Sequence, residues 1–271
     1  MKIDVVTLFP GMFQGPFDES MIRIARERGL VDLRIFDLRE FSTDPHRKVD
    51  DRPYGGGPGM VLSPPPVFRA LEELSGRRAS ETQAGEATDE AAEDAESTEA
   101  TLPTFILTTP QGQRYEQETA WQLSRQDHLI ILCGHYEGYD ERIREGFPFL
   151  ELSIGDYVLT GGEIPAMALV DSVIRLLPGV VGDPESIVAE SFEGGLLDCP
   201  QYTRPYDFRG QTVPEVLRSG DHRKIQEWRH RQAVERTEAR ARRSPRPLPG
   251  KGASDGSPAW GKRRSEKGLE S

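Results

Sequence analysis

Short apolar runs along the chain alternate with longer segments in which apolar residues recur at helical spacing. The strand-like runs are residues 2–9, 31–36, 104–109, 128–134 and 148–155. The helix-like segments are residues 17–28, 67–74, 115–125, 140–145, 164–177 and 221–243. Strands that alternate with helices are typical of a parallel sheet whose faces are covered by those helices. The pattern therefore predicts an α/β fold.

One predicted helix, residues 164–177, is apolar almost all round. Its apolar positions include Ile164, Met167, Leu169, Val170, Val173, Ile174 and Leu177. A helix of this kind is buried on more than one side. We expect the sheet to cover one side, and a second subunit is a candidate for the other.

Three segments have no periodic pattern. Residues 75–103 are rich in Ala, Glu, Thr and Ser, a composition that predicts a disordered insertion, with a functional acidic arm as the alternative. We interpret residues 182–198 as a linker and residues 244–271 as a disordered basic tail. The rest of the chain then divides into a large domain, residues 1–181, and a small helical domain, residues 199–243.

The net charge of −11 is concentrated in one part of the chain. Residues 80–101 hold eight acidic residues and no basic one, whereas residues 218–243 hold nine Lys or Arg and four Asp or Glu. A basic surface near the C-terminus is therefore compatible with nucleic-acid binding.

Two cysteines, Cys133 and Cys199, cannot form a disulfide framework, which favours the cytoplasm. We expect neither a signal peptide nor a membrane helix, which needs roughly 18–20 apolar residues.

Glycine-bearing segments follow three of the predicted strands. They are TTPQG (108–112), CGHYEGYDER (133–142) and SIGDYVLTGGEIPAM (153–167). Ligands of open α/β sheets bind outside the carboxyl ends of the strands, so the three segments favour one pocket walled by backbone N–H and C=O groups. Such groups suit an adenine edge and a ribose. Taken singly, each glycine has the simpler interpretation of a turn.

Other candidate residues lie outside these segments. The glycines of VDDRPYGGGPGM (49–60) allow a close approach to a ligand, but the segment lacks the lysine motif of a P-loop, and a surface loop is the alternative. Arg175 lies in the apolar helix and is either ion-paired or aimed at an anionic intermediate. Glu190 and Asp198 lie in the linker, where most carboxylates face water.

Together these segments resemble one family, the TrmD family of bacterial tRNA (guanine-N1)-methyltransferases. The matching segments run in order through most of residues 1–236: LFPGMF, HRKVDDRPYGGGPGM, TPQG, CGHYEGYDER, SIGDYVLTGGEIPAM, DSVIRLLPGVVG, SFEGGLLDCPQYTRP and VPEVLRSGDHRKIQEWR. The resemblance implies a SPOUT-type α/β domain with a deep C-terminal trefoil knot, a rare exception to unknotted topology. It also implies a homodimer with active sites at the subunit interface, and a helical C-terminal domain that binds the tRNA anticodon stem-loop.

The resemblance further implies a reaction and the residues for it. S-adenosylmethionine is the expected methyl donor, and Mg²⁺ is an expected cofactor. The expected methyl acceptor is N1 of guanosine 37 in tRNAs with G at position 36. This modification is expected to support reading-frame maintenance. Glu190 is the expected general base and Arg175 the expected stabiliser of charge on O6, together with Glu137. The expected cofactor contacts are Thr109, Pro110, Gln111, Gly134, Tyr136, Glu137, Gly138, Ser153, Ile154, Gly155, Asp156, Tyr157, Val158, Leu159, Gly161, Gly162 and Pro165. The expected tRNA contacts are His46, Asp50 and Arg52.

The linker departs from the family pattern at one position. The family usually has aspartate in a Glu-Asp-Ser-Phe context, whereas this chain has Ala189, Glu190, Ser191 and Phe192. The acid is retained with one additional methylene, which changes its reach. Asp198 is the alternative base, although its GLLDCP context indicates a structural role.

Three other functions are alternatives to this one. A ribose 2′-O-methyltransferase of the same superfamily would share the cofactor segments but not the C-terminal module. A catalytically silent tRNA-binding protein would result if Glu190 failed as a base. A nucleotide hydrolase that uses the GGGPG segment is the weakest, since no phosphate-binding lysine motif is present.

Overall fold

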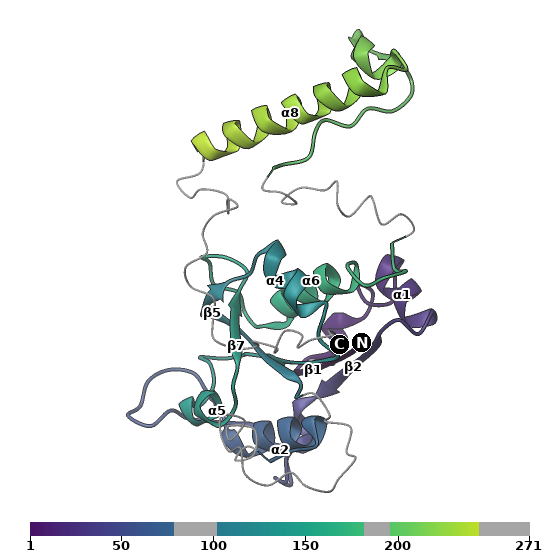
Figure 1. The fold of residues 1–271 in the computed structure, drawn as a ribbon. Coiled ribbons are helices and arrows are strands. Elements are labelled where there is room, and N and C mark those ends of the chain that lie inside the picture. The colour runs from purple at the N-terminus through teal and green to yellow at the C-terminus, as the bar shows by residue number, and fades with distance from the viewer. Residues whose placement is uncertain (79–101, 182–195, 244–271) are drawn as a thin grey trace, which may run out of the picture. The chain divides into compact units, whose positions relative to one another are not determined.

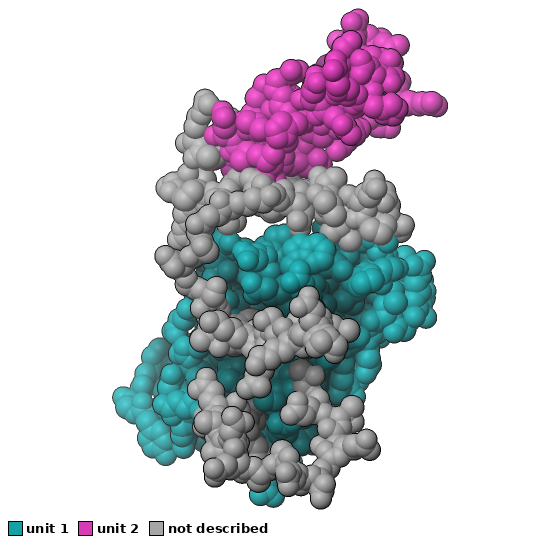
Figure 2. Space-filling model, viewed as in Figure 1, with its two compact units in different colours: residues 1–187 teal, residues 188–271 magenta. Residues whose placement is uncertain are grey.

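A computed structural model describes residues 1–78, 102–181 and 196–243. The chain divides into two compact units, residues 1–187 and 188–271, which are coloured separately in Figure 2. Most of the predicted insertion (75–103), most of the predicted linker (182–198) and all of the predicted tail (244–271) lie outside the described residues. The domain boundaries proposed from the sequence therefore stay a prediction.

The first unit is built on a five-stranded sheet with the order β2-β1-β6-β5-β7 (Figure 1). The strands are β1 (Lys2–Thr7), β2 (Asp32–Asp37), β5 (Thr104–Arg114), β6 (His128–Cys133) and β7 (Leu150–Ser153). All neighbouring strands in this sheet are parallel. The predicted α/β fold is thus confirmed, and each predicted strand is present with shifted ends.

Helices cover both faces of the sheet (Figure 1). One face carries α1 (Ser20–Glu27), α4 (Gln117–Leu123) and α6 (Glu163–Ile174), and the other carries α2 (Pro64–Ser75) and α5 (Glu141–Gly146). The connecting elements are the 3-10 helices η1 (Pro10–Phe13) and η2 (Leu38–Phe41) and the antiparallel pair β3 (Asp50–Asp51) and β4 (Val61–Leu62). α2 begins three residues earlier than predicted, because proline suits the first turn of a helix.

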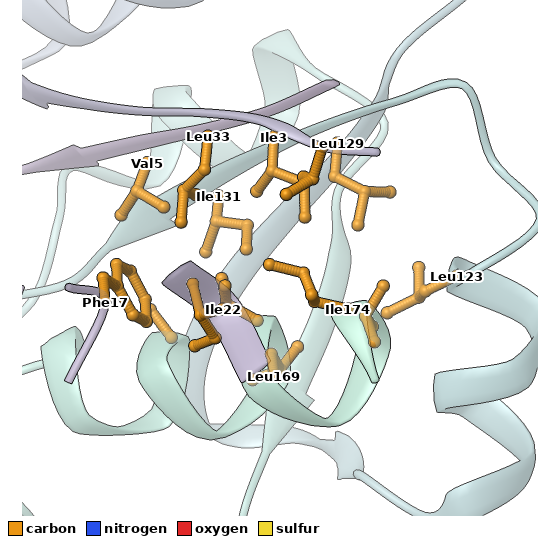
Figure 3. Close-up of a cluster of buried hydrophobic side chains, with 14 of the residues drawn as sticks. Ile3, Val5, Phe17, Ile22, Leu33, Leu123, Leu129, Ile131, Leu169 and Ile174 are labelled. Carbon is orange, nitrogen blue, oxygen red and sulfur yellow. The ribbon is translucent and has the colours of Figure 1, made fainter. Parts of the chain in front are cut away.

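Alternate residues of the central strands supply two apolar cores. Ile3 and Val5 of β1 lie in one cluster with Leu169 and Ile174 of α6 (Figure 3), whereas Val6 belongs to the cluster beneath α2. These side chains are almost completely buried, and burial of each stabilises the fold by about 1.5–3 kcal/mol. Because both faces are covered, the central strand β6 is a continuous apolar run over residues 129–133.

Strand β5 differs from its prediction. It continues to Arg114 instead of ending at residue 109, and its pairing with β7 shifts register between Thr108 and Gln113. The TTPQG segment is therefore an irregular part of a strand, and its prediction as a loop after the strand was wrong. Pro and Gly usually end regular pairing, but here pairing resumes beyond the irregularity.

The second unit contains the long helix α8 (His222–Arg243), which agrees with the predicted basic helix. It also contains the 3-10 helix η4 (Glu215–Arg218) and a hairpin of β8 (Asp207–Phe208) and β9 (Gln211–Thr212) that the sequence did not predict. Among its described residues only Cys199 and Ala233 are buried. Nowhere in the described ranges is a helix long and apolar enough to cross a membrane.

Asp4 is a buried carboxylate on the central strand β1. It accepts hydrogen bonds of 2.8 and 2.9 Å from Arg34, and it lies 2.8 Å from Nε2 of His128 and 3.4 Å from Nζ of Lys2. Burial alone would raise the pKa of Asp4, but the hydrogen bonds from His128 and Arg34 and the charge of Lys2 hold it below its ordinary value of 3.8. The charged form of Asp4 therefore ties β1, β2 and β6 together.

Replacing Asp4 with asparagine should lower the free energy of unfolding by about 2 kcal/mol, because hydrogen bonds to a charged group are stronger than those to an amide. This loss of stability is smaller than the loss expected on breaking a fully buried ion pair, since Arg34 and Lys2 are partly exposed. The folded pKa is lowered, so this stabilisation is complete above the unfolded pKa of about 3.9 and is lost as the pH falls through the folded pKa. Urea unfolding at pH 7 and pH 3 should show a larger difference between wild type and variant at pH 7.

The exposed carboxylate of Asp32, on the neighbouring strand, provides a matched control for this prediction. Asp32→Asn should change the free energy of unfolding by less than about 0.5 kcal/mol, because its nearest cation, Arg34, is 3.9 Å away and both groups are solvated. Equal losses in the two variants would contradict a special role for Asp4.

Candidate active site

A pocket of about 340 Å³ lies at the carboxyl ends of β6 and β7, beside the irregular part of β5. Its walls come from three parts of the chain: residues 108–111 of β5, residues 134–144 after β6, and residues 152–165 around the end of β7. This volume falls within the roughly 300–1,000 Å³ typical of small-molecule sites. The predicted convergence of the glycine-bearing segments is therefore present in the fold.

The predicted cofactor residues meet in this pocket with one exception. The lining residues include Thr109, Pro110, Gln111, Gly134, Tyr136, Glu137, Gly138, Ser153, Ile154, Gly155, Tyr157, Val158, Leu159, Gly161, Gly162 and Pro165. Asp156 lies in the same segment but does not line the pocket. Their roles toward a ligand stay a prediction, since lining a pocket does not identify what binds in it.

Two glycines bring the segments after β6 and β7 into contact. The N–H group of Gly162 donates a 2.7 Å hydrogen bond to the carbonyl of Gly134, and His135 forms an isolated antiparallel bridge with Gly161. A Cβ atom added at Gly162 would meet Thr108 Oγ1 and lie 2.7 Å from the nitrogen of Gly134. The chain after β7 thus returns to the strand end of β6. The deep trefoil knot implied by the resemblance stays a prediction.

Tyr136 and Glu137 form the wall that faces the glycine-rich segment 49–60. Tyr136 has a φ of +61°, a left-handed conformation that is strained for a residue other than glycine and is often found at functional sites. The N–H group of Glu137 donates to the carbonyl of Met60 at 3.1 Å, and the N–H group of Leu62 donates to the carbonyl of Gly138 at 3.0 Å. The segment 49–60 therefore supports this wall.

Asp50, predicted to contact tRNA, influences the ionisation of Tyr136 in this wall of the pocket. Partial burial and the negative charge of Asp50 raise the pKa of Tyr136, and the positive charge of Arg39 opposes that shift. The other two predicted tRNA residues, His46 and Arg52, are exposed. None of the three lines the pocket.

An arginine that the sequence analysis missed, Arg144 of α5, also lines the pocket. It donates to both carboxylate oxygens of Glu151, at 2.6 and 2.7 Å, and to the side-chain oxygen of Gln111 at 3.4 Å. The ion pair with Glu151 raises the already high pKa of Arg144, so the group is a permanent cation. Five further lining residues lie within the three predicted segments but were not among the expected cofactor contacts: Thr108, His135, Tyr139, Glu141 and Thr160. Of the lining residues, Arg144 and Leu152 lie outside these segments, and no sequence signal pointed to a role for them in the pocket.

Within a single chain, the predicted catalytic residues do not all line the pocket. Glu137 lines it, whereas Arg175 is the half-buried residue that follows the last turn of α6 and does not line it. Glu190 lies outside the described residues. Asp198 accepts the N–H of Cys199 at 2.7 Å and the side-chain amide of Gln201 at 3.2 Å, which supports its structural interpretation.

No metal site is apparent in the described part of the chain. Nowhere in residues 1–78, 102–181 and 196–243 do three or more His, Cys, Asp or Glu side chains lie together as metal ligands would. Two carboxylates at the pocket, Glu137 and Glu141, are exposed and do not form part of a group of this kind. The arrangement suits an organic ligand held by backbone groups, with carboxylates available to a cationic part of it.

Known proteins match this chain over most of its length. The family profile described as tRNA (Guanine-1)-methyltransferase TrmD matches residues 1–244. A tRNA (guanine-N(1)-)-methyltransferase of Geobacillus kaustophilus (strain HTA426) is 51% identical over 237 residues, which cover 88% of each chain. One of Bacillus cereus (strain AH820) is 50% identical over 240 residues, which cover 89% of this chain and 90% of the relative. The chain is therefore a member of the TrmD family of tRNA (guanine-1)-methyltransferases.

Proposed function

We propose that this protein transfers a methyl group from S-adenosylmethionine to N1 of guanosine 37 in tRNAs that have G at position 36. The family membership supports the reaction class. The single observation that carries the proposal to this chain is the pocket in which three glycine-bearing segments converge, at the ends of β6 and β7 and at the irregular part of β5. A tRNA substrate also favours a cytoplasmic enzyme, whose product would support reading-frame maintenance.

The pocket fits S-adenosylmethionine in size and chemistry. Residues around Gly134 and Gly162 offer backbone donors and acceptors for the adenine and ribose, and Tyr139 adds an aromatic ring. Exposed Glu137 and Glu141 provide negative charge beside a cationic sulfonium. When bound, this cofactor supplies an electrophilic methyl group on a good leaving group, so the protein needs no nucleophilic residue.

The residues of the chain must then prepare the guanine. Neutral guanine carries a proton on N1, and its removal leaves negative charge that spreads to O6. Glu190 is the proposed general base, a role suited to a positioned carboxylate. Arg175 is the proposed cation that stabilises O6, with Glu137 as a further member of the catalytic group.

The position of Arg175 supports a site shared between two copies of the chain. The twelve residues of α6 separate Arg175 from the pocket-lining start of that helix by about 18 Å at a rise of 1.5 Å per residue. Met12, Met21 and Ile164 are exposed apolar residues on η1, α1 and α6, whose elements contact one another. We propose that a homodimer covers this apolar surface and completes the active site with Arg175 of one copy.

A requirement for Mg²⁺ is a separate part of the proposal. The described residues contain no group of three or more His, Cys, Asp or Glu side chains that could hold a metal ion. A requirement for Mg²⁺ would be measured as loss of methyl transfer, at constant tRNA folding, after treatment with a chelator.

The second unit is the proposed contact for the anticodon stem-loop. Tyr202, Tyr206 and Phe208 are exposed aromatic rings, and the guanidinium of Arg218 lies 3.9 Å from the ring centre of Tyr206. The guanidinium of Arg209 lies 5.2 Å from the ring centre of Phe208. Arginines beside exposed rings suit RNA, since the rings stack on unpaired bases and the cations contact phosphates.

Replacing Arg218 with glutamine should weaken tRNA binding about three- to tenfold at low salt. The loss of one phosphate contact should also reduce the slope of log K against log salt by about 0.7–0.9. Filter binding of a tRNA transcript between 50 and 200 mM salt measures both effects.

Arg23, an exposed arginine of α1 paired with Glu27, provides the matched control for Arg218. Arg23→Gln should leave the affinity within twofold and the slope unchanged. If the two variants share one slope, Arg218 contacts no phosphate.

One experiment tests the proposed function directly. The protein is incubated with labelled S-adenosylmethionine and a tRNA transcript with G at positions 36 and 37, and the methyl group is mapped by nuclease digestion and mass spectrometry. The proposal predicts methylation at N1 of guanosine 37. A methyl group on a ribose would favour the 2′-O-methyltransferase, and tRNA binding without transfer would favour the silent tRNA-binding protein.

A further inference from the structure

A buried polar cluster lies behind the cofactor pocket and has no role in the reaction described above. It consists of Thr7 at the end of β1, Glu163 in the first turn of α6, and His135 in the pocket wall after β6, and we call it the Thr7–Glu163–His135 cluster. Glu163 is 1% exposed, although a carboxylate is rarely buried without specific partners. Specific partners must therefore hold this carboxylate in place.

Two features stabilise the carboxylate of Glu163 in this position. The hydroxyl of Thr7 donates a 2.8 Å hydrogen bond to Oε1 of Glu163. The position in the first turn of α6 adds the favourable field of a helix N-terminus, which stabilises negative charge. One oxygen of Glu163 is thus engaged with β1, and the other, Oε2, points toward His135.

His135 presents an unsatisfied nitrogen to that oxygen. Its Nδ1 atom is buried, has no hydrogen-bond partner among the described residues, and lies 4.0 Å from Oε2 of Glu163. The imidazole is held by ring contacts with Phe9 at 4.7 Å and Tyr136 at 4.8 Å. Buried polar atoms are rarely left unpaired, and approach by about 1 Å would bring this pair within hydrogen-bond distance.

Gly161 leaves the space between the two groups open. A Cβ atom added there would lie 2.6 Å from Nδ1 of His135 and still closer to Oε2 of Glu163. Any other residue at this position would therefore keep the carboxylate and the imidazole apart. Gly161 and His135 both line the pocket, so the gap lies directly behind the proposed cofactor site.

We propose that Glu163 is a positioning residue for cofactor binding, whose carboxylate accepts a hydrogen bond from Nδ1 of His135 when the pocket is filled. This bond would fix the wall that begins at His135 and continues through Tyr136 and Glu137. It would also lock that wall to the segment after β7 through Gly161. The inference rests on the proposed function for the identity of the ligand.

The opposing interpretation gives Glu163 a purely structural role. In that case the carboxylate only anchors α6 to β1 through Thr7, and the approach of His135 has no consequence for the pocket. The two interpretations differ in a measurable way, because the structural role affects stability and the positioning role affects ligand affinity at similar stability.

The test uses S-adenosylhomocysteine as the ligand, without tRNA, so that turnover does not enter. Glu163→Gln should raise its Kd about tenfold in calorimetry, since the amide is a weaker acceptor than the carboxylate. Asp4→Asn, the matched control at another buried carboxylate, should lower the melting temperature but keep Kd within twofold, because Asp4 bonds to Arg34 and His128 and does not line the pocket. If both variants change Kd in proportion to their loss of stability, the positioning role is wrong.

A second measurement keeps the test valid if Glu163→Gln does not fold. Imidazole ¹⁵N spectra of the wild-type protein report the tautomer of each histidine, and His135→Gln assigns the signal of interest among the five histidines. Addition of S-adenosylhomocysteine should convert His135 to the Nδ1-protonated, hydrogen-bonded form. Binding with an unchanged His135 signal overturns this inference alone, whereas absence of binding to the wild type contradicts the proposed function itself.

Discussion

Replacing Glu190 with glutamine should lower the single-turnover rate of methyl transfer by roughly 10²–10⁴-fold, the range by which a general base accelerates proton transfer. Glutamine has nearly the same shape as glutamate but cannot accept the N1 proton of guanine. Because the proposed cofactor residues belong to the first unit, the affinity for S-adenosylhomocysteine should stay within twofold. Rapid-quench assays with enzyme in excess of tRNA measure the chemical step separately from product release.

Two further variants separate the base from its neighbours. Glu190→Asp restores the carboxylate usual in the family with one methylene less, so it should retain a rate at least about tenfold above that of Glu190→Gln. Asp198→Asn should stay within about threefold of the wild type, because Asp198 caps its own backbone and contacts Gln201. A large loss of rate in Asp198→Asn together with a near-normal rate in Glu190→Gln would mean that Asp198, and not Glu190, is the general base.

The sheet and the pocket were predictable because local sequence encodes both. Residues 129–133 of β6 form a continuous apolar run, which is typical of a strand buried on both faces. In a parallel sheet the carboxyl ends of neighbouring strands share one edge. The glycines after β6 and β7 could therefore be assigned to one pocket without knowledge of their contacts.

Contacts between distant segments could not be predicted in the same way. Thr7 and Glu163 are 156 residues apart, and no periodicity relates a threonine at a strand end to a glutamate at a helix start. Arg144 was missed for the same reason, since its contacts with Glu151 of β7 and Gln111 of β5 depend on where the fold places α5 relative to these strands. The register shift in β5 likewise results from pairing with β7 and not from the TTPQG sequence alone.

Replacing Gly162 with alanine should abolish measurable cofactor binding, with a loss of at least about a hundredfold, or 2.8 kcal/mol. Gly162 has a φ of −83°, which any residue can adopt, so the effect is steric and not conformational. The added Cβ would meet Thr108 Oγ1 and would lie 2.7 Å from the nitrogen of Gly134 and 2.9 Å from the Cα of Cys133. Two of these three atoms belong to the backbone, which cannot rotate away as a flexible side chain can.

The segments after β6 and β7 would then have to separate, and the 2.7 Å hydrogen bond from Gly162 to Gly134 would break. Overpacking of this kind also lowers the free energy of unfolding by about 1–3 kcal/mol. Calorimetry with S-adenosylhomocysteine and thermal unfolding measure the two effects. Gly11→Ala is the matched control, because nothing lies within 4 Å of its added Cβ and alanine suits a helical turn. Cofactor affinity that is equal in the two variants would mean that the contact between Gly134 and Gly162 does not shape the binding site.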